Sequence, residues 1–273
     1  MKKYVNLFVF VFMVGACFSQ GKAQTKSAVS YKNPVVDIAM PDPTVIKAAD
    51  GYFYMYATES TRNVPIMKSK DLVQWTYCNT AFTNKTRPRF EPKAGIWAPD
   101  INYINNKYVL YYAMSVWGGE QTCGIGVATA DSPQGPFTDH GKMFRSNEIG
   151  VQNSIDPSFL QYEGRNYLVW GSFRGIYVIE LTEDGLSLKP GAEKKRIAGT
   201  AFEAAYIHKH GDYYYMFASI GSCCEGIRST YKVVVGRSKK IWGPYKDKSG
   251  KPMLKNGYSL VIGANDHFVG NGH

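Results

Sequence analysis

The chain has 273 residues with 44% hydrophobic and 14% aromatic content, enough apolar surface for one large core. Twenty tyrosines and frequent turn residues favour strands, so we expect a single all-β domain. The formal net charge is +10, but Lys and Arg are scattered through turns without a nucleic-acid-binding pattern, which argues against a nucleic-acid partner. The charge fits a solvated basic surface or an affinity for acidic polysaccharide.

Residues 1–24 have the pattern of an export signal, followed by a linker at 25–34 and the folded domain at 35–273. Lys2 and Lys3 precede an apolar run that is too short to remain as a membrane span. Two cleavage sites fit: one after Ala23 releases the protein, and a lipobox ending at Cys17 leaves a lipid anchor there. Both predict export from a bacterial cell, to the periplasm, the medium or, with the lipid, the outer membrane.

A unit made of an acidic residue, an apolar strand, a polar turn and an aromatic-rich strand occurs four times. The acids are Asp42, Asp100, Asp156 and Glu203. Repeats of about 40–50 residues with four short strands are typical of propeller blades. We place these blades at residues 35–82, 96–144, 154–197 and 201–254, and expect a fifth to begin at residue 258 and stop at residue 273. The sequence therefore predicts a five-bladed β-propeller, truncated in its last blade.

Three of these acids, Asp42, Asp156 and Glu203, share one position of successive repeats in the sequence. Proline follows Asp42 and Asp156, which predicts an extended backbone at both acids. Carboxylates gathered at a propeller axis are costly unless they are used. Glycoside hydrolysis uses two, an acid and a base, and a third can raise the acid's pKa. Asp100 is offset by about two residues, so we expect it to be structural rather than catalytic.

Two aromatic residues and a cysteine pair complete the set of candidates. Trp97 is either a sugar-stacking platform or a core wedge, and Trp117 is a second candidate for the cleft. Apart from Cys17, the cysteines have neither the number of a disulfide scaffold nor the spacing of a zinc site. The adjacent Cys223 and Cys224 either form a disulfide or remain two thiols.

The chain resembles glycoside hydrolase family 43 from about residue 35 onward. Pro-Asp-Pro-Thr-Val-Ile at 41–46, Trp-Ala-Pro-Asp at 97–100, Ser-Ile-Asp-Pro-Ser at 154–158 and Phe-Glu-Ala-Ala-Tyr at 202–206 carry the resemblance. It implies a five-bladed propeller enzyme that hydrolyses arabinose- or xylose-containing polysaccharides with inversion. On this resemblance Asp42 is the general base, Asp156 tunes and orients the acid, and Glu203 is the general acid.

The resemblance also implies a substrate pocket and a metal. Trp97 and Asp100 help to build the pocket, and Ser154 and Trp117 are further substrate-binding candidates. Ser-Cys-Cys-Glu-Gly at 222–226 is similar to the endo-1,5-α-L-arabinanase branch. Gly-Asn-Gly-His at 270–273 resembles that branch's Gly-Pro-Gly-His, which implies that His273 lies near a bound Ca²⁺.

The sequence therefore predicts an exported endo-acting enzyme that cleaves α-1,5-linked L-arabinan, a monomer without a membrane span. Pro41 stands where the branch often has a histidine, so endo and exo action both remain open. One alternative is an exo-acting α-L-arabinofuranosidase or β-xylosidase on the same fold. Another is a non-catalytic carbohydrate-binding propeller, which the three carboxylates disfavour. The basic charge is expected to hold the enzyme near acidic pectin, which carries arabinan side chains.

Overall fold

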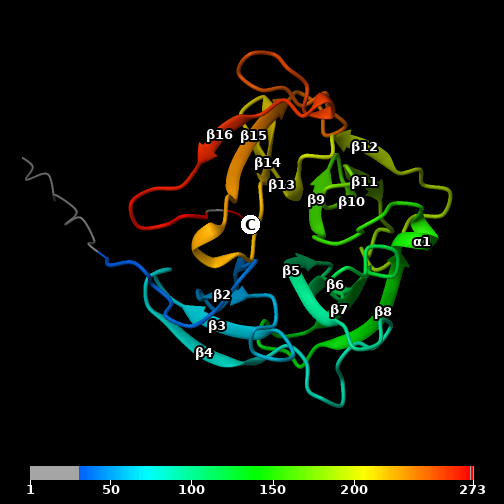
Figure 1. Cartoon of the computed structure of the whole chain (residues 1–273). Helices are drawn as coiled ribbons and strands as arrows, with labels where there is room; N and C mark the ends of the chain where they lie inside the picture. The colour runs from blue at the N-terminus through cyan, green and yellow to red at the C-terminus, as the bar shows by residue number, and fades with distance from the viewer. Residues whose placement is uncertain (1–30, 271, 273) are drawn as a thin grey trace, which may run out of the picture. The chain divides into compact units, whose positions relative to one another are not determined.

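The computed structural model describes residues 31–270 and 272, which form four antiparallel sheets (Figure 1). All helices and strands that the structure describes lie in the unit of residues 33–273. The predicted export signal, with Cys17, and most of the linker lie outside the described residues, as does His273. Within the described part of the chain, no helix is long and apolar enough to cross a membrane.

Each sheet has four strands paired in chain order, so one continuous stretch of sequence builds each sheet. The first contains β1 (Thr44–Lys47), β2 (Phe53–Tyr56), β3 (Pro65–Ser69) and β4 (Trp75–Thr80). The second contains β5 (Gly95–Ile104), β6 (Lys107–Ser115), β7 (Gly124–Ala130) and β8 (Thr138–Arg145). The third contains β9 (Ser158–Tyr162), β10 (Arg165–Trp170), β11 (Ile176–Glu180) and β12 (Lys195–Ala198). The fourth contains β13 (Glu203–His210), β14 (Tyr213–Ile220), β15 (Lys232–Ser238) and β16 (Ser259–Ile262).

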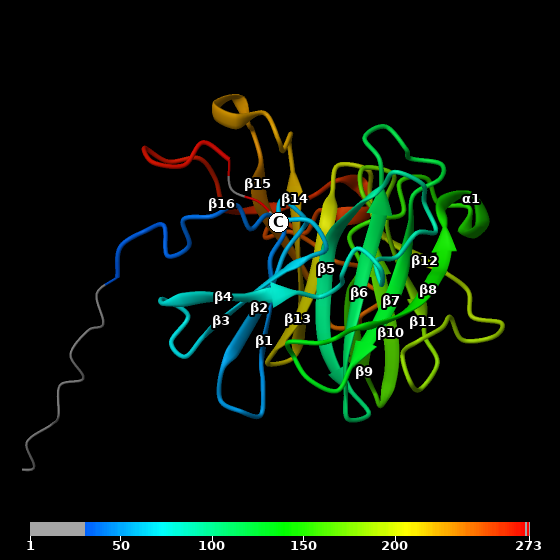
Figure 2. The same cartoon turned by 90° about the horizontal axis from the view of Figure 1, so that it is seen from below.

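The sheets are arranged as propeller blades. Figure 1 shows them around a common centre, with the first strand of each nearest to it, and Figure 2 shows them from the side. The inner strands β1, β5, β9 and β13 lie next to one another in that order. A short helix, α1 (Ser146–Ile149), follows β8, and single helical turns lie at Gly226–Arg228 and Met253–Lys255. The predicted all-β propeller arrangement is therefore confirmed for four blades.

Apolar side chains fill the space between successive sheets. One core cluster joins the first and second sheets, another the second and third, and another the third and fourth. Strand β6 shows why: Leu110 and Tyr112 point to the first sheet, while Val109 and Tyr111 point to the third. Because both faces of this strand are covered, its sequence is an almost continuous apolar run rather than an alternation of apolar and polar residues.

The predicted start of a fifth blade at residue 258 is wrong. Strand β16 pairs with β15, where Leu260 lies opposite Val234, and so completes the fourth sheet. The segment that directly follows β15 forms no continuous strand, because Lys246 makes only isolated bridges to Arg237 and Pro252. The outer edge of the fourth sheet is therefore formed by the later strand β16.

Among the described residues, no core cluster joins the fourth sheet to the first. Tyr206 on the fourth sheet is 54% exposed, and its cross-strand neighbour Phe217 is only partly buried. On the first sheet, Val45 and Tyr77 are also exposed. These two sheets thus present apolar side chains that the described part of the chain does not cover.

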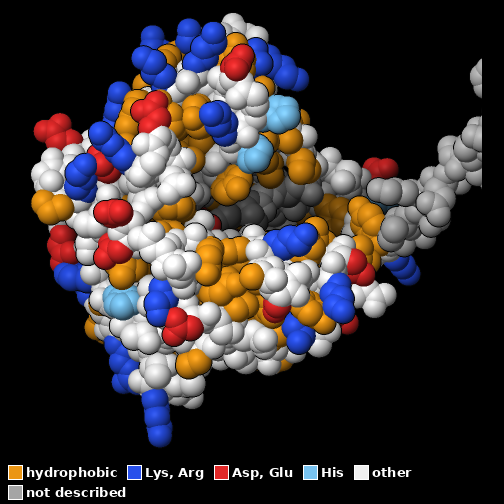
Figure 3. All heavy atoms as spheres, turned by 180° about the vertical axis from the view of Figure 1, so that it is seen from behind, with side chains coloured by type: hydrophobic (Ala, Val, Ile, Leu, Met, Phe, Trp, Pro, Cys, Tyr) orange, Lys and Arg blue, Asp and Glu red, His pale blue; other side chains and the backbone are white. Residues whose placement is uncertain are grey.

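The basic charge is spread over the surface. Figure 3 shows Lys and Arg side chains scattered over one face, mixed with acidic and polar groups, rather than gathered in one patch. This distribution agrees with the scattered sequence positions.

Candidate active site

Each inner strand begins with the same β-bulge. In the fourth sheet, Glu203 pairs with Ser219 and Tyr206 with Phe217, so three steps along β13 match two along β14. The backbone pairing in the other three sheets shows the same shift. The four bulges span residues 41–44, 97–100, 155–158 and 203–206. A bulge bends its strand and re-aims side chains, and bulges are common beside active sites.

The second residue of every bulge has a left-handed backbone. Its φ is 51° at Asp42, 41° at Ala98, 58° at Asp156 and 52° at Ala204. The extended backbone predicted for the two aspartates is therefore wrong. The bulge imposes a conformation that Asp tolerates better than most residues.

Proline suits the next position of the bulge. The extra residue of a bulge has no partner in the ladder. Proline has no N–H to leave unpaired, so it is compatible with this position. Three of the four bulges carry proline there, at positions 43, 99 and 157.

The bulge register corrects the sequence alignment of the acids. Asp42 and Asp156 do occupy equivalent positions, but the equivalent residue of the fourth sheet is Ala204. Glu203 lies one position earlier, and Asp100 two positions later in its own bulge. Three acids therefore do not share one backbone position, and Glu203 enters the site from a different point of its strand.

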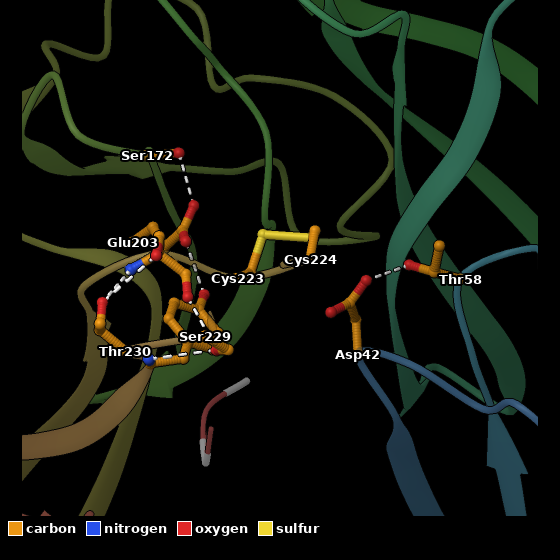
Figure 4. Close-up of a disulfide and its surroundings, with 10 residues drawn as sticks. Asp42, Thr58, Ser172, Glu203, Cys223, Cys224, Ser229 and Thr230 are labelled. Carbon is orange, nitrogen blue, oxygen red and sulfur yellow. Dashed lines mark hydrogen bonds between the residues drawn. A yellow bond between two sulfur atoms is a disulfide. The ribbon is translucent and has the colours of Figure 1, made fainter. Parts of the chain in front are cut away.

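Glu203 is held by two hydroxyl groups. Its side chain is buried, and it accepts hydrogen bonds from Ser172 Oγ at 2.7 Å and from the Tyr231 hydroxyl at 2.6 Å (Figure 4). Asn153 Nδ2 donates to Ser172 Oγ at 2.9 Å and so orients that hydroxyl. Burial and the Glu203 carboxylate raise the pKa of Tyr231, which keeps it a donor. One carboxylate oxygen is thus fixed from the third sheet and the other from the fourth.

Asp156 is buried and lies near both other acids. Burial raises the pKa of its carboxyl well above the usual range, and the neighbouring Glu203 and Asp42 carboxylates raise it further. The Ala204 N–H donates to Asp156 Oδ2 at 3.2 Å and opposes this rise only in part. Asp156 therefore resists ionisation, first because it is buried and second because two other carboxylates lie near it.

Asp42 contacts the second sheet through a threonine. Thr58 Oγ1 donates to Asp42 Oδ2, and Thr58 Oγ1 in turn accepts the Ala98 N–H at 2.7 Å. Ala98 and Ala204 occupy equivalent bulge positions, and the backbone N–H of each is bound from the preceding sheet. The bulges of neighbouring blades are therefore hydrogen-bonded to each other beside the acids.

Asp100 ties three inner strands together. Its carboxylate accepts the Phe159 N–H from β9 at 2.7 Å, Asn102 Nδ2 at 2.8 Å and Thr44 Oγ1 from β1 at 3.4 Å. Burial raises the pKa of Asp100 to about 6, although these hydrogen bonds lower it. These contacts agree with the expected structural role of Asp100. Its predicted contact with the substrate stays a prediction.

The two tryptophans lie together. Trp97 is half-buried against Ala113, Cys123 and Ile155, and its ring centroid lies 5.8 Å from that of Trp117. Trp117 is 78% exposed. Trp97 thus has the contacts of a wedge, and Trp117 presents the larger free aromatic surface.

Ser154 does not fit its predicted role in substrate binding. The residue is fully buried. Its hydroxyl donates to the Val151 carbonyl at 2.8 Å and accepts Trp170 Nε1 at 3.1 Å. The hydroxyl thus donates one hydrogen bond and accepts another inside the protein. Ser154 therefore fixes the backbone just before Asp156.

Cys223 and Cys224 form a disulfide, one of the two states left open by the sequence. Figure 4 shows Glu203 and Asp42 among the residues around it, one on each side of it in that view. Within the described residues, no three His, Cys, Asp or Glu side chains gather as a metal site would require.

Sequence reasoning missed Thr58, Ser172 and Tyr231. A signal for two of them exists, because the second strands of the first and third blades end in a small residue followed by a hydroxyl residue, Ala57-Thr58 and Gly171-Ser172. Tyr231 carries no such signal, since it becomes adjacent to Glu203 only through strand pairing.

This propeller has three interacting carboxyl groups at its inner strands. A glycoside hydrolase needs two such groups, one as acid and one as base, so the site meets this requirement. Residues 31–273 match the family model of glycosyl hydrolases family 43, and the chain belongs to that family.

Two characterised relatives and one solved structure resemble the chain over most of its length. The chain is 38% identical to the extracellular endo-α-(1→5)-L-arabinanase 1 of Bacillus subtilis, covering 85% of this chain and 75% of that protein. It is 35% identical to an extracellular exo-α-(1→5)-L-arabinofuranosidase of Cellvibrio japonicus, with 85% and 73% covered. The structure of Cellvibrio cellulosa α-L-arabinanase complexed with arabinohexaose superposes with a TM-score of 0.78 at 33% identity, covering 85% of this chain and 81% of that one.

Proposed function

We propose that this protein hydrolyses α-1,5-linked L-arabinan at internal linkages with inversion of configuration. The observation that carries the proposal is the carboxyl cluster, in which both Asp42 and Glu203 raise the pKa of Asp156. The similarity to an arabinanase of Bacillus subtilis and to an arabinanase solved with arabinohexaose supports the choice of substrate.

In the proposed mechanism, Asp42 is the general base. Its carboxylate takes a proton from a water molecule as that water attacks the anomeric carbon of an arabinofuranosyl unit. Glu203 is the general acid and protonates the departing glycosidic oxygen. The attack and the departure occur in one displacement, so the configuration inverts. Inversion requires carboxyl groups about 6.5–9.5 Å apart, which leaves room for the water.

Asp156 and two hydroxyl groups serve the acid. Burial and the neighbouring Glu203 and Asp42 carboxylates raise the pKa of Asp156, so the protons of these three neighbouring groups are coupled. Ser172 and Tyr231 restrict the rotation of the Glu203 carboxyl group. A fixed acid can transfer its proton along one direction, and this orientation lowers the entropic cost of reaching the transition state.

The test is the product profile on linear 1,5-α-arabinan. We expect a mixture of oligosaccharides early in the reaction, with an inverted anomer as the first product detected by NMR. Glu203→Gln should lower kcat by a factor of about 10² to 10⁴, the usual contribution of a general acid. Its circular dichroism should match that of the wild type. Near-normal activity of the purified variant would refute the assignment of Glu203.

Exo action is the second candidate, because a similar relative is named as an exo-acting arabinofuranosidase. It predicts arabinose as the only early product. A non-catalytic propeller predicts binding of arabinan without any reducing ends being formed. The same experiment therefore separates all three functions.

We also propose that a fifth sheet fills the space between the fourth and first sheets. The exposed apolar side chains of Tyr206 and Val45 support it, because such surfaces are normally covered. A crystal structure should show further strands packed on these residues. Direct packing of the fourth sheet on the first would contradict this.

Two further proposals rest on the resemblance and on the relatives. A Ca²⁺ ion near His273 would either be structural or tune the pKa values of the site; a structural ion predicts that a chelator lowers Tm with recovery on adding Ca²⁺, and a tuning ion predicts that it displaces the pH profile of activity instead. Export is supported by the extracellular relatives. Fractionation of the source cells should recover the protein outside the cytoplasm, and a lipid on Cys17 would retain it in the membrane fraction.

A further inference from the structure

The disulfide lies in a loop that starts beside Glu203. Ser219 pairs with Glu203, β14 ends one residue later, and β15 starts at Lys232. The loop of residues 221–231 therefore leaves the fourth sheet at the acid. Figure 2 shows this loop, with its helical turn, projecting from one end of the sheets.

The base of this loop is closed by short-range hydrogen bonds. Ser229 Oγ donates to the Ser222 carbonyl at 2.8 Å, and the Ser222 N–H donates to Thr230 Oγ1 at 3.0 Å. At Gly221 a side chain would meet the Thr230 carbonyl oxygen at 2.5 Å, so only glycine permits this approach. Tyr231 follows directly and holds Glu203. The position of the loop is thus fixed relative to the acid.

The Cys223–Cys224 disulfide is the part of this loop that reaches the acids. Cys224 is exposed and Cys223 is partly exposed. Figure 4 shows the Asp42 carboxylate and the Glu203 carboxylate on either side of the disulfide. A molecule bound between the two acids would therefore lie against the sulfur atoms.

A stabilising role explains this disulfide poorly. Disulfides stabilise mainly by restricting the unfolded chain, and more so when they close long loops. This one joins neighbouring residues, so it restricts almost nothing beyond its own peptide unit. What it does create is a small rigid ring, closed through the peptide unit between the two cysteines, whose disulfide side has no charge and no N–H or O–H donor and whose sulfur atoms are polarisable.

We propose that the Cys223–Cys224 disulfide is a substrate-binding surface, on which the C–H face of a pentofuranose ring packs next to the scissile bond. This rests on the proposed function, since the ligand is the same arabinan chain. The contact is non-covalent and leaves the disulfide oxidised. Asp42 and Glu203 face the polar edges of the sugar, and the disulfide contacts its apolar face.

The test measures binding apart from chemistry. In a Glu203→Gln background, we compare the Kd for 1,5-α-arabinohexaose by calorimetry with and without Cys223→Ala plus Cys224→Ala. The double substitution should raise Kd about tenfold. In the catalytically intact protein it should raise KM by a similar factor while kcat and its pH profile stay the same. Cys78→Ala, a half-buried thiol on β4, is the matched control and should change none of these.

Three outcomes would overturn the inference. An unchanged Kd and KM in a protein that cleaves arabinan refutes the disulfide contact alone. A fall in kcat with a displaced pH profile and an unchanged Kd shows that the disulfide only positions Glu203. A wild type that neither cleaves arabinan nor, as Glu203→Gln, binds arabinohexaose refutes the proposed function and this inference together.

Chemical reduction gives an independent measurement should the double variant fail to fold. Treatment of Glu203→Gln with a phosphine reductant opens the ring without any substitution. We expect Kd for arabinohexaose to rise about tenfold and to recover on reoxidation. A reduced protein that binds as tightly as the oxidised one refutes the proposal.

Discussion

Asp100→Asn should change how the stability of this protein depends on pH. Burial raises the pKa of Asp100 from 3.8 to about 6 in the folded state. The folded state therefore holds this proton more tightly than the unfolded chain, and stability falls as pH rises from about 4 to about 6. A difference of about 2 pKa units, at about 1.4 kcal/mol each, corresponds to about 3 kcal/mol lost by the wild type at neutral pH.

Asparagine is suited to this test because it keeps the contacts without the charge. Its carbonyl oxygen can accept the Phe159 N–H and the Asn102 amide, which both donate to the same carboxylate oxygen. Its amide group can donate to Thr44 Oγ1, which also accepts the Ile101 N–H. The substitution therefore removes the ionisation of the side chain and leaves the links between β1, β5 and β9 in place.

The assay is urea unfolding of wild type and variant at about pH 3.5 and at pH 7. The variant should gain about 2–3 kcal/mol relative to the wild type between these two pH values. Comparing two pH values cancels any constant effect of the substitution. Asp131→Asn, whose side chain is 85% exposed, is the control and should show no such change. A difference between variant and wild type that is flat with pH would refute the argument that burial dominates at Asp100.

Three other substitutions test separate features. Tyr231→Phe removes a hydrogen bond to the Glu203 carboxylate and should lower kcat/KM by a factor of about 10 to 150, which corresponds to about 1.5–3 kcal/mol; unaltered kinetics would exclude a positioning role. Arg87→Met leaves the buried Glu59 carboxylate without its partner, and should cost about 3–5 kcal/mol in urea unfolding, so a loss below about 1 kcal/mol would contradict the buried pair. Trp117→Ala should raise KM for arabinan at constant kcat, because a ring this exposed is expected to contact the sugar equally in the ground state and in the transition state, and equal losses in kcat and kcat/KM would disprove it.

The propeller could be predicted because each blade repeats the same local sequence pattern. An acid, an apolar strand and an aromatic strand recur, and β6 carries an apolar run that only a doubly covered strand requires. The fourth blade was the exception. Gly243-Pro244-Tyr245 repeats the turn of the second blade, but the strand that follows it is interrupted at Lys246. Whether a turn is followed by a paired strand depends on non-local hydrogen bonds.

The acids could be identified from the sequence, but their geometry could not. Proline after Asp42 and Asp156 indicated an extended backbone, because proline restricts its predecessor by local sterics. Pairing with the next strand imposed the left-handed bulge instead, and pairing is a tertiary property. The same limit applies to Tyr231, which is 28 residues from Glu203 in the chain and is brought to it by β14 and β15.

The repeated bulge has a consequence for how such a site can arise. Ala98 and Ala204 adopt the same left-handed backbone as Asp42 and Asp156, although an alanine gains nothing from aiming at the centre. The geometry is therefore a property of the blade, maintained whether or not a functional side chain occupies it. Each of the four described blades offers an equivalent bulge position, which carries an acid in two of them, while Glu203 extends from the neighbouring position of the fourth blade. A change of one residue can thus add or remove a carboxyl group at the centre without rebuilding the scaffold.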